Sequence, residues 1–291
     1  DTMTYRIHDN QWEVNGKDTV MTLGAAAKVM LTVTDSTRKG YDMEYTFLEF
    51  VSDDQIKSEA QNLVGQAMDI LNDATVGTTI RFRTDQYGKI IKYYNLKDIR
   101  KQAKEILTKS ISKMPYADSL RAVGLKLDKL MSLIDSDNLV DGYTEEIELL
   151  FNYHGDQYKI GETESHEEAT ENEYASDTKT DIWLDPDTYE YGISADVYSY
   201  IPREDIKVLL GNLIEYFTDE ESAKDVREGL DTEFDSQVTT DGVCNSYVRI
   251  SYFNDGWPQE VVSQNNISLG DRQKLKQKYI TWDYRSVGHS E

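Results

Sequence analysis

The clearest pattern of hydrophobic and polar positions lies near the end of the chain, in Tyr247–Leu269 (YVRISYFNDGWPQEVVSQNNISL). Apolar and polar residues alternate, the alternation stops at Asn254–Gly256, and it resumes after Trp257 and Pro258. Alternation on both sides of an Asn-Asp-Gly turn is typical of a β-hairpin. Similar strand pairs recur along the chain, so the sequence predicts sheets built from hairpins.

The same alternation predicts further strands, although residues 1–17 carry no clean period. In the strand predicted at 41–51, one face holds Tyr41, Met43, Tyr45 and Phe47. Glu146–Tyr153 is predicted as a strand or an extended segment. The other predicted strands are 20–33, 78–84, 89–94, 180–184, 191–200, 233–239 and 274–284.

Apolar residues at helical spacing predict helices in blocks between these strands. One helix follows Ser52 and another follows Asn95, both residues that can cap a helix N-terminus. Pro202 begins a third helix, with a buried stripe that includes Leu209 and Leu213. Further helices are predicted at 120–134 and 219–230.

Hairpin-joined strands with intervening helices predict an α+β protein, with antiparallel sheets and amphipathic helices packed on one side. Thr79–Leu107 and Asp181–Leu210 share the order strand, Asp-containing turn, strand, polar cap and helix. An internal duplication gives this order, and so does a generic strand–turn–strand–helix unit. The acidic segment after Gly161 is the best boundary, so we predict two halves, 1–160 and 161–291, or one continuous domain.

Composition and charge narrow the classes of function. Twenty tyrosines against seven phenylalanines fit a sheet with one solvated face, because a tyrosine ring packs while its hydroxyl stays in water. The net charge of −23 repels phosphate backbones and disfavours a nucleic-acid partner. Between Glu162 and Glu190 lie eleven acidic residues and one basic residue, a local balance of −10. This stretch fits a solvated loop or strand face better than a surface for a calcium-rich or cationic partner.

The compartment is only partly constrained by the sequence. Cys244 is the single cysteine, so no internal disulfide can form, which is compatible with the cytosol and with a periplasm-like compartment. No apolar run is long enough to span a bilayer. The chain opens at Asp1 without a methionine, and we interpret it as a mature form whose leader has been removed.

Sequence motifs for catalysis or cofactor binding are missing. The chain has no Gly-x-Gly-x-x-Gly, no phosphate-binding Gly-Lys-Ser/Thr loop and no Gly-x-Ser-x-Gly elbow. Its four histidines stand singly, without a second histidine or a cysteine at metal-ligand spacing. We therefore predict a protein that is not an enzyme and that has no cofactor and no metal.

Carboxylates leave two alternatives open. Asp185, Asp187 and Glu190 offer the hard oxygen ligands that calcium prefers, but an Asp-Pro-Asp hairpin turn explains the same residues. Among 54 acidic residues, a carboxylate pair suited to glycoside hydrolysis can also arise.

Aromatic residues are the candidate ligand contacts. Trp257, between the Asn-Asp-Gly turn and Pro258, is expected to close the end of its hairpin, with stacking on a sugar or lipid as the alternative. The candidate ligand-binding residues are Trp183, Tyr198, Tyr200 and Trp257.

Three short patterns occur together: Phe82–Ile91 (FRTDQYGKII) before a helix, Lys159–Glu164 (KIGETE) after a helical block, and Asp255–Pro258 (DGWP) between late strands. Together they resemble a group of uncharacterised exported proteins and lipoproteins of Bacteroides-like bacteria. That group often has a Gly-Asp-Ser-Trp-like sequence at the second pattern, whereas this chain has neither Asp nor Trp directly after Gly161. The resemblance supplies no catalytic residues. It implies export to the periplasm or cell surface, with a lipid anchor as one form of attachment, and a curved sheet of the kind that lipoprotein carriers use.

The preferred hypothesis is an exported, non-enzymatic protein that binds an apolar or amphipathic ligand in a concave pocket between sheet and helices. A cell-surface interaction or adhesion module, using the tyrosine-rich face or an exposed sheet edge, is the first alternative. A hydrolase with an unrecognised Asp/Glu pair is the second. The partners that fit these hypotheses are a lipid, a glycan or another protein.

Overall fold

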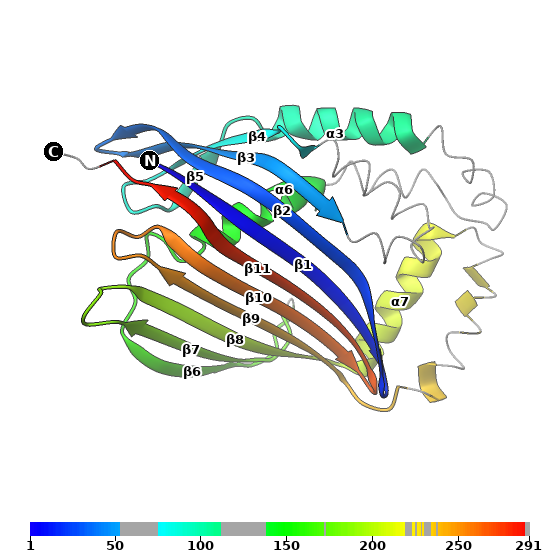
Figure 1. The fold of residues 1–291 in the computed structure, drawn as a ribbon. Helices are drawn as coiled ribbons and strands as arrows, with labels where there is room; N and C mark the ends of the chain where they lie inside the picture. The colour runs from blue at the N-terminus through cyan, green and yellow to red at the C-terminus, as the bar shows by residue number, and fades with distance from the viewer. Residues whose placement is uncertain are drawn as a thin grey trace.

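One large sheet dominates the structure, a computed structural model that describes residues 1–52, 75–111, 138–171, 173–218, 223–224, 226–227, 229, 234–236 and 238–288. Its strands are β1 (Thr2–Asn15), β2 (Asp18–Thr37), β3 (Gly40–Ser52), β4 (Thr79–Thr84), β5 (Ile90–Tyr93), β6 (Gly161–Glu167), β7 (Ser176–Leu184), β8 (Tyr191–Ile201), β9 (Gly242–Tyr252), β10 (Pro258–Leu269) and β11 (Arg272–Ser286). These eleven strands lie in the order β5-β4-β3-β2-β1-β11-β10-β9-β8-β7-β6, and the sheet is bent and open (Figure 1). Every neighbouring pair is antiparallel, which confirms the prediction of an antiparallel sheet built from hairpins.

Three helices have described bounds: α3 (Leu96–Ile111), α6 (Asn138–Phe151) and α7 (Arg203–Phe217). Ile147, Leu150 and Phe151 of α6 and Ile99 of α3 belong to the same buried core as the sheet residues. In Figure 1, α6 lies behind the central strands, against the face that carries this core.

The two faces of the sheet differ in chemistry. Met3, Tyr5 and Ile7 of the central strand β1 point to one face, where they meet Ile280 and Val261 in the core. We call this the inner face, and the opposite one the outer face. Because side chains alternate along a strand, register assigns each strand residue to one of the two. Tyr41, Met43, Tyr45 and Phe47 all contribute to the inner-face core, as the sequence predicted.

One expectation about elements was wrong, and one strand lies where no period was found. Strand β1 lacks a clean period because its inner face changes after Ile7 from apolar residues to Asp9, Gln11 and Glu13. The segment expected to be extended at Glu146–Tyr153 belongs mostly to α6, where Ile147, Leu150 and Phe151 recur at helical spacing and are buried.

Details of the helices also differ from expectation. Asn95 does not cap α3 with its side chain, which instead bonds to β4: Oδ1 accepts from the Arg81 amide at 2.9 Å and Nδ2 donates to the Thr79 carbonyl at 2.8 Å. Leu209 and Leu213, expected in a buried stripe of α7, are 58% and 44% exposed.

The remaining predicted elements are only partly covered by the described residues. Residues 234–236, expected in a strand, are helical. The helices predicted at 52–72 and 120–134 lie outside the described residues, apart from residue 52, which ends β3. Within the described part of the chain, every helix is too short or too polar to cross a bilayer.

The sheet is continuous across the predicted domain boundary at 160/161. Strands from both halves belong to it, and β1 pairs with β11 over nearly its whole length, from Thr2–Ser286 to Asn15–Arg272. The division into halves and the internal duplication stay predictions.

Candidate ligand-binding pocket

A depression of about 400 Å³ opens on the inner face, at the end of the strands nearest the two chain ends. Its walls come from strand ends, from two hairpin turns and from the segment that follows α6. It is continuous with the core, since Met43 and Phe151 belong to both. The lining residues are Asp1, Val33, Tyr41, Met43, Thr84, Gln86, Tyr87, Gly88, Phe151, His154, Tyr191, Asp255, Gly256, Trp257, Pro258, Val287 and Gly288.

The β4–β5 turn forms one wall. Asp85 Oδ1 accepts hydrogen bonds from the backbone amides of Tyr87 at 2.8 Å and Lys89 at 2.9 Å, which fixes the turn. Gly88 has φ +88°, and a Cβ there would lie 2.5 Å from Cδ2 of His154. Glycine therefore allows the turn to approach the histidine ring closely.

His154 joins three separate segments at the floor of the pocket. Its Nε2 lies 2.9 Å from the carbonyl oxygen of Gly256 in the β9–β10 turn. Its ring packs against Phe151, with centroids 5.1 Å apart, and against Tyr252 at 5.0 Å. Burial lowers the pKa of His154, although the hydrogen bond to Gly256 opposes the shift, so a neutral imidazole is favoured at pH 7.

The pocket combines aromatic walls with acidic groups. Tyr191 stacks on Tyr252 with centroids 4.9 Å apart, and Tyr41, Tyr87 and Trp257 add further rings. Two of the lining residues, Asp1 and Asp255, carry carboxylates, and none of those described is a lysine or an arginine. Arg285, outside the lining, forms an ion pair with Asp255. This arrangement can receive a flat apolar group together with a hydrogen-bond donor or a positive charge.

The four aromatic residues chosen from the sequence do not come together. Trp257 lies in the pocket and packs partly against the core. Tyr198 and Tyr200 of β8 and Trp183 of β7 point to the outer face, since Ile193 and Ile182 on the same strands face the core. Their role in binding stays a prediction.

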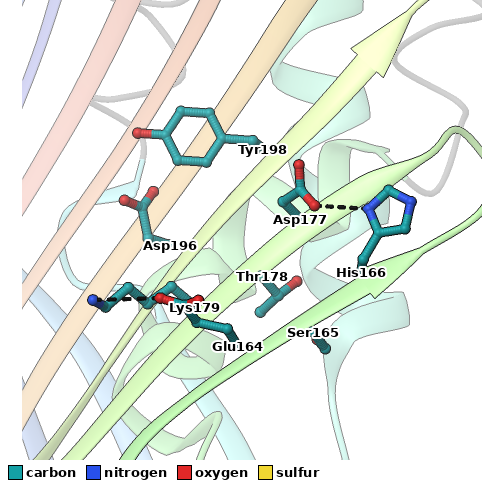
Figure 2. Close-up of a pocket in the computed structure, with 8 residues that line it drawn as sticks. All are labelled: Glu164, Ser165, His166, Asp177, Thr178, Lys179, Asp196 and Tyr198. Carbon is teal, nitrogen blue, oxygen red and sulfur yellow. Dashed lines mark hydrogen bonds and ion pairs between the residues drawn. The ribbon is translucent and has the colours of Figure 1, made fainter.

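Figure 2 shows a second, polar depression of about 460 Å³, which Tyr198 helps to line. His166 Nδ1 lies 2.7 Å from Asp177 Oδ1, and Tyr200 donates its hydroxyl proton to Asp177 Oδ2 at 2.9 Å. The hydrogen bond with Asp177 raises the pKa of His166. Lys179 lies 3.7 Å from Glu164, so most charges around this depression are already paired.

Trp183 has a packing explanation. It pairs with Gly192 across β7 and β8, and a Cβ on Gly192 would meet the indole ring and would lie 2.7 Å from the Ile250 carbonyl. The ring therefore covers a glycine on the outer face. It also borders a third depression of about 340 Å³, with Arg249, Glu260 and other outer-face residues.

A cluster of charged residues lies between α6 and the inner face. Lys278 Nζ lies 2.6 Å from Glu146, 2.7 Å from Glu145 and 3.6 Å from Asp9, and Lys276 contacts Glu145 at 3.0 Å. Burial raises the pKa of Asp9. Burial also opposes ionisation of Glu145, but the two lysines outweigh it and lower its pKa. These carboxylates are bound to lysines, which favours a role in holding α6 over a role in acid–base chemistry.

The side chain of Asp185 stabilises the β7–β8 turn in which it lies. Its Oδ1 accepts the backbone amides of Asp187 at 2.8 Å and Thr188 at 3.1 Å, and these bonds lower the pKa of Asp185. Among the described residues, no group of three or more His, Cys, Asp or Glu side chains is placed to hold a metal ion.

Sequence reasoning missed His154, Tyr87 and Tyr191 as pocket residues. They come from three distant segments, and only the contacts between turns unite them. The best available signal for the pocket in the sequence is a glycine in each of the two turns that line it. These glycines are Gly88 and Gly256, and both have a positive φ.

No family model matches the chain, and no curated protein matches it. Among solved structures, a match is found with one described as "Lipid-protein interactions in lipovitellin", at 8% sequence identity and a TM-score of 0.40. The match covers all of this chain and 26% of the other, so the chain spans about a quarter of that protein's length. A likeness this weak assigns neither a fold family nor a function.

Proposed function

We propose that the protein is a non-enzymatic binding protein that holds an amphipathic small molecule in the inner-face pocket. The observation that carries the proposal is the depression of about 400 Å³ with walls of Tyr41, Tyr87, Tyr191 and Trp257. Small-molecule pockets are typically concave, of about 300–1,000 Å³, mostly apolar, and supplied with a few polar groups that orient the ligand.

The lining favours a ligand with a flat apolar body and a hydrogen-bond-donating or cationic end. The aromatic side chains offer faces for stacking, and Asp255 and Gln86 offer acceptor oxygens. A carboxylate-bearing ligand is disfavoured by the carboxylates of Asp1 and Asp255, because the described lining has no lysine or arginine and Arg285 is already paired with Asp255.

Two further parts of the proposal concern architecture and compartment. In this proposal, α3 and α6 cover part of the inner face, and the pocket is the part of that face that they leave open. The buried residues of the two helices support this arrangement. Export to the periplasm or cell surface, with or without a lipid anchor, agrees with the resemblance of the three sequence patterns to exported proteins.

Native mass spectrometry of the mildly purified protein tests for a bound ligand first. An added mass that disappears on denaturation supports the proposal and gives the mass of the ligand. Calorimetric titration then compares three amphiphiles that share one naphthyl body and end in an amine, an alcohol or a carboxylate. We expect the amine and the alcohol to bind more tightly than the carboxylate.

The matched variants are Tyr87→Ala and Tyr189→Ala. Both tyrosines are 65% exposed and lie in equivalent hairpin turns, but only Tyr87 lines the pocket. Loss of one aromatic wall should weaken binding by roughly fivefold to tenfold in Tyr87→Ala and leave Tyr189→Ala unchanged. Two results together would overturn the proposal: a native mass without any bound ligand, and amphiphile affinities that Tyr87→Ala does not change.

A further inference from the structure

The β6 strand is a free sheet edge of unusual composition. It pairs with β7 over seven consecutive residues, Gly161↔Ile182 to Glu167↔Ser176, with no register shift. It stands at the end of the strand order, and Figure 1 shows it at the border of the sheet. Among the described residues, no backbone hydrogen bond satisfies its outward-facing amides and carbonyls.

This strand contributes nothing to the core. Its sequence, GETESHE, has no apolar side chain, and all seven residues are exposed. Natural proteins usually shorten, bulge or cover such an edge, because it is a template for pairing with another chain. Here the edge is regular and uncovered within the described structure, and its only protection is charge.

The charges determine which strand can pair. On the outer face, Glu162 and Glu164 share the single cation Lys179, at 3.3 and 3.7 Å. The depression in Figure 2 lies beside them, rimmed by Asp177, Asp196 and Tyr198. A neighbouring strand with lysine or arginine at alternate positions would place each cation opposite these carboxylates, and cross-strand pairs of opposite charge are stabilising.

A second copy of this chain is a poor occupant. Pairing of β6 with β6 would bring the glutamates of both copies onto one face, and like charges opposite each other are destabilising. With a net charge of −23, two copies also repel at longer range.

We propose that β6 is a docking edge for a basic, extended peptide segment of a partner protein, which adds to the sheet as a twelfth strand beside Glu162 and Glu164. Main-chain hydrogen bonds to the β6 edge supply affinity, and the alternating cations supply selectivity. This site is separate from the inner-face pocket and does not depend on the ligand proposed for it.

Hydrogen exchange of the full chain tests the proposal with three synthetic peptides. In the first, lysine alternates with threonine. In the second, lysine alternates with proline, which keeps the charge but removes the strand-forming backbone donors. In the third, glutamate replaces lysine. We expect the first peptide alone to slow amide exchange in Gly161–Glu167, with an affinity that falls as salt is added.

Paired substitutions separate the edge from general acidity. Glu162→Gln with Glu164→Gln should weaken binding of the lysine–threonine peptide by about fivefold, because two exposed ion pairs are lost. Glu171→Gln with Glu173→Gln removes two exposed charges outside the strand and should leave binding unchanged. Equal binding of the lysine–proline peptide, protection outside β6, or equal effects of the two double substitutions would overturn the proposal.

Discussion

The side-chain amino group of Lys278 on β11 lies 2.6 Å from the Glu146 carboxylate of α6. The same amino group donates to Glu145 at 2.7 Å, so the preceding residue of the helix is held as well. The lysine side chain is only 4% exposed. A buried charge thus attaches α6 to the central strands, in addition to the apolar contacts of Ile147 and Leu150.

Lys278→Met should destabilise the protein by about 3–5 kcal/mol, because the largely buried carboxylate of Glu146 loses this lysine, whereas Glu145 keeps Lys276. Urea denaturation followed by circular dichroism measures the loss. Lys274→Met is the control: Lys274 lies on the same strand and face but is exposed, and its replacement should change stability by less than about 0.5 kcal/mol. Equal effects of the two substitutions would show that the ion pairs do not hold α6.

Two described histidines should have pKa values shifted in opposite directions, His154 downwards and His166 upwards. Burial lowers the pKa of His154 below 6.5, whereas the hydrogen bond with Asp177 raises that of His166 above 6.5. His154 thus contributes stability above pH 6.5 that is lost as the pH falls towards its folded pKa. His166 contributes stability below pH 6.5 that is lost as the pH rises through its folded pKa. Proton NMR of the imidazole signals, assigned with His154→Gln and His166→Gln, checks both directions; two midpoints on the same side of 6.5 would contradict them.

Gly192→Ala should lower stability by about 1–3 kcal/mol, because the added methyl group meets the Trp183 ring and the Ile250 carbonyl. Denaturant titration measures the loss, and tryptophan fluorescence should report a more solvated indole. The matched substitution Gly229→Ala meets no atom within 4 Å and should be neutral or slightly stabilising. If both variants behave alike, Trp183 does not pack on Gly192.

Asn95→Ala should cost about 1–2 kcal/mol, since it removes two hydrogen bonds between the β5–α3 junction and β4. Thermal unfolding measures the change. Asn212→Ala, at an exposed position in α7, replaces asparagine with a better helix former and should not destabilise the protein. If Asn95→Ala leaves the stability unchanged, the two hydrogen bonds to β4 do not stabilise the protein and Asn95 only marks the start of α3.

Alternation revealed most of the sheet because most strands bury one face and expose the other to solvent, whereas β6 is exposed on both faces. It identified Tyr41, Met43, Tyr45 and Phe47 as one buried face and placed the turn of the β9–β10 hairpin at Asn254–Gly256. It failed for β1, where the inner face turns from Ile7 to Asp9 as the apolar core gives way to the charged cluster of Lys278. It failed for α6 because a short apolar run does not distinguish a strand from a helix.

The candidate pocket was harder to predict than the sheet. Trp257 could be chosen from sequence because it stands directly after a turn. His154 could not, since its partners at Gly88 and Gly256 are distant in sequence and contribute backbone rather than a recognisable side chain. Trp183, Tyr198 and Tyr200 were chosen for their aromatic character, which does not reveal which face of a strand they occupy.

The pairing of β1 with β11 has a consequence for how the chain folds. Thr2 lies opposite Ser286, so the central ladder joins the most distant described parts of the sequence. Contacts of such high sequence separation slow folding, because a long loop must be closed before they can form. Until β11 has emerged from the ribosome, β1 presents a long unpaired edge that carries Met3, Tyr5 and Ile7. The nascent chain is therefore most vulnerable to aggregation along a strand that ends up fully paired, next to the middle of the finished sheet.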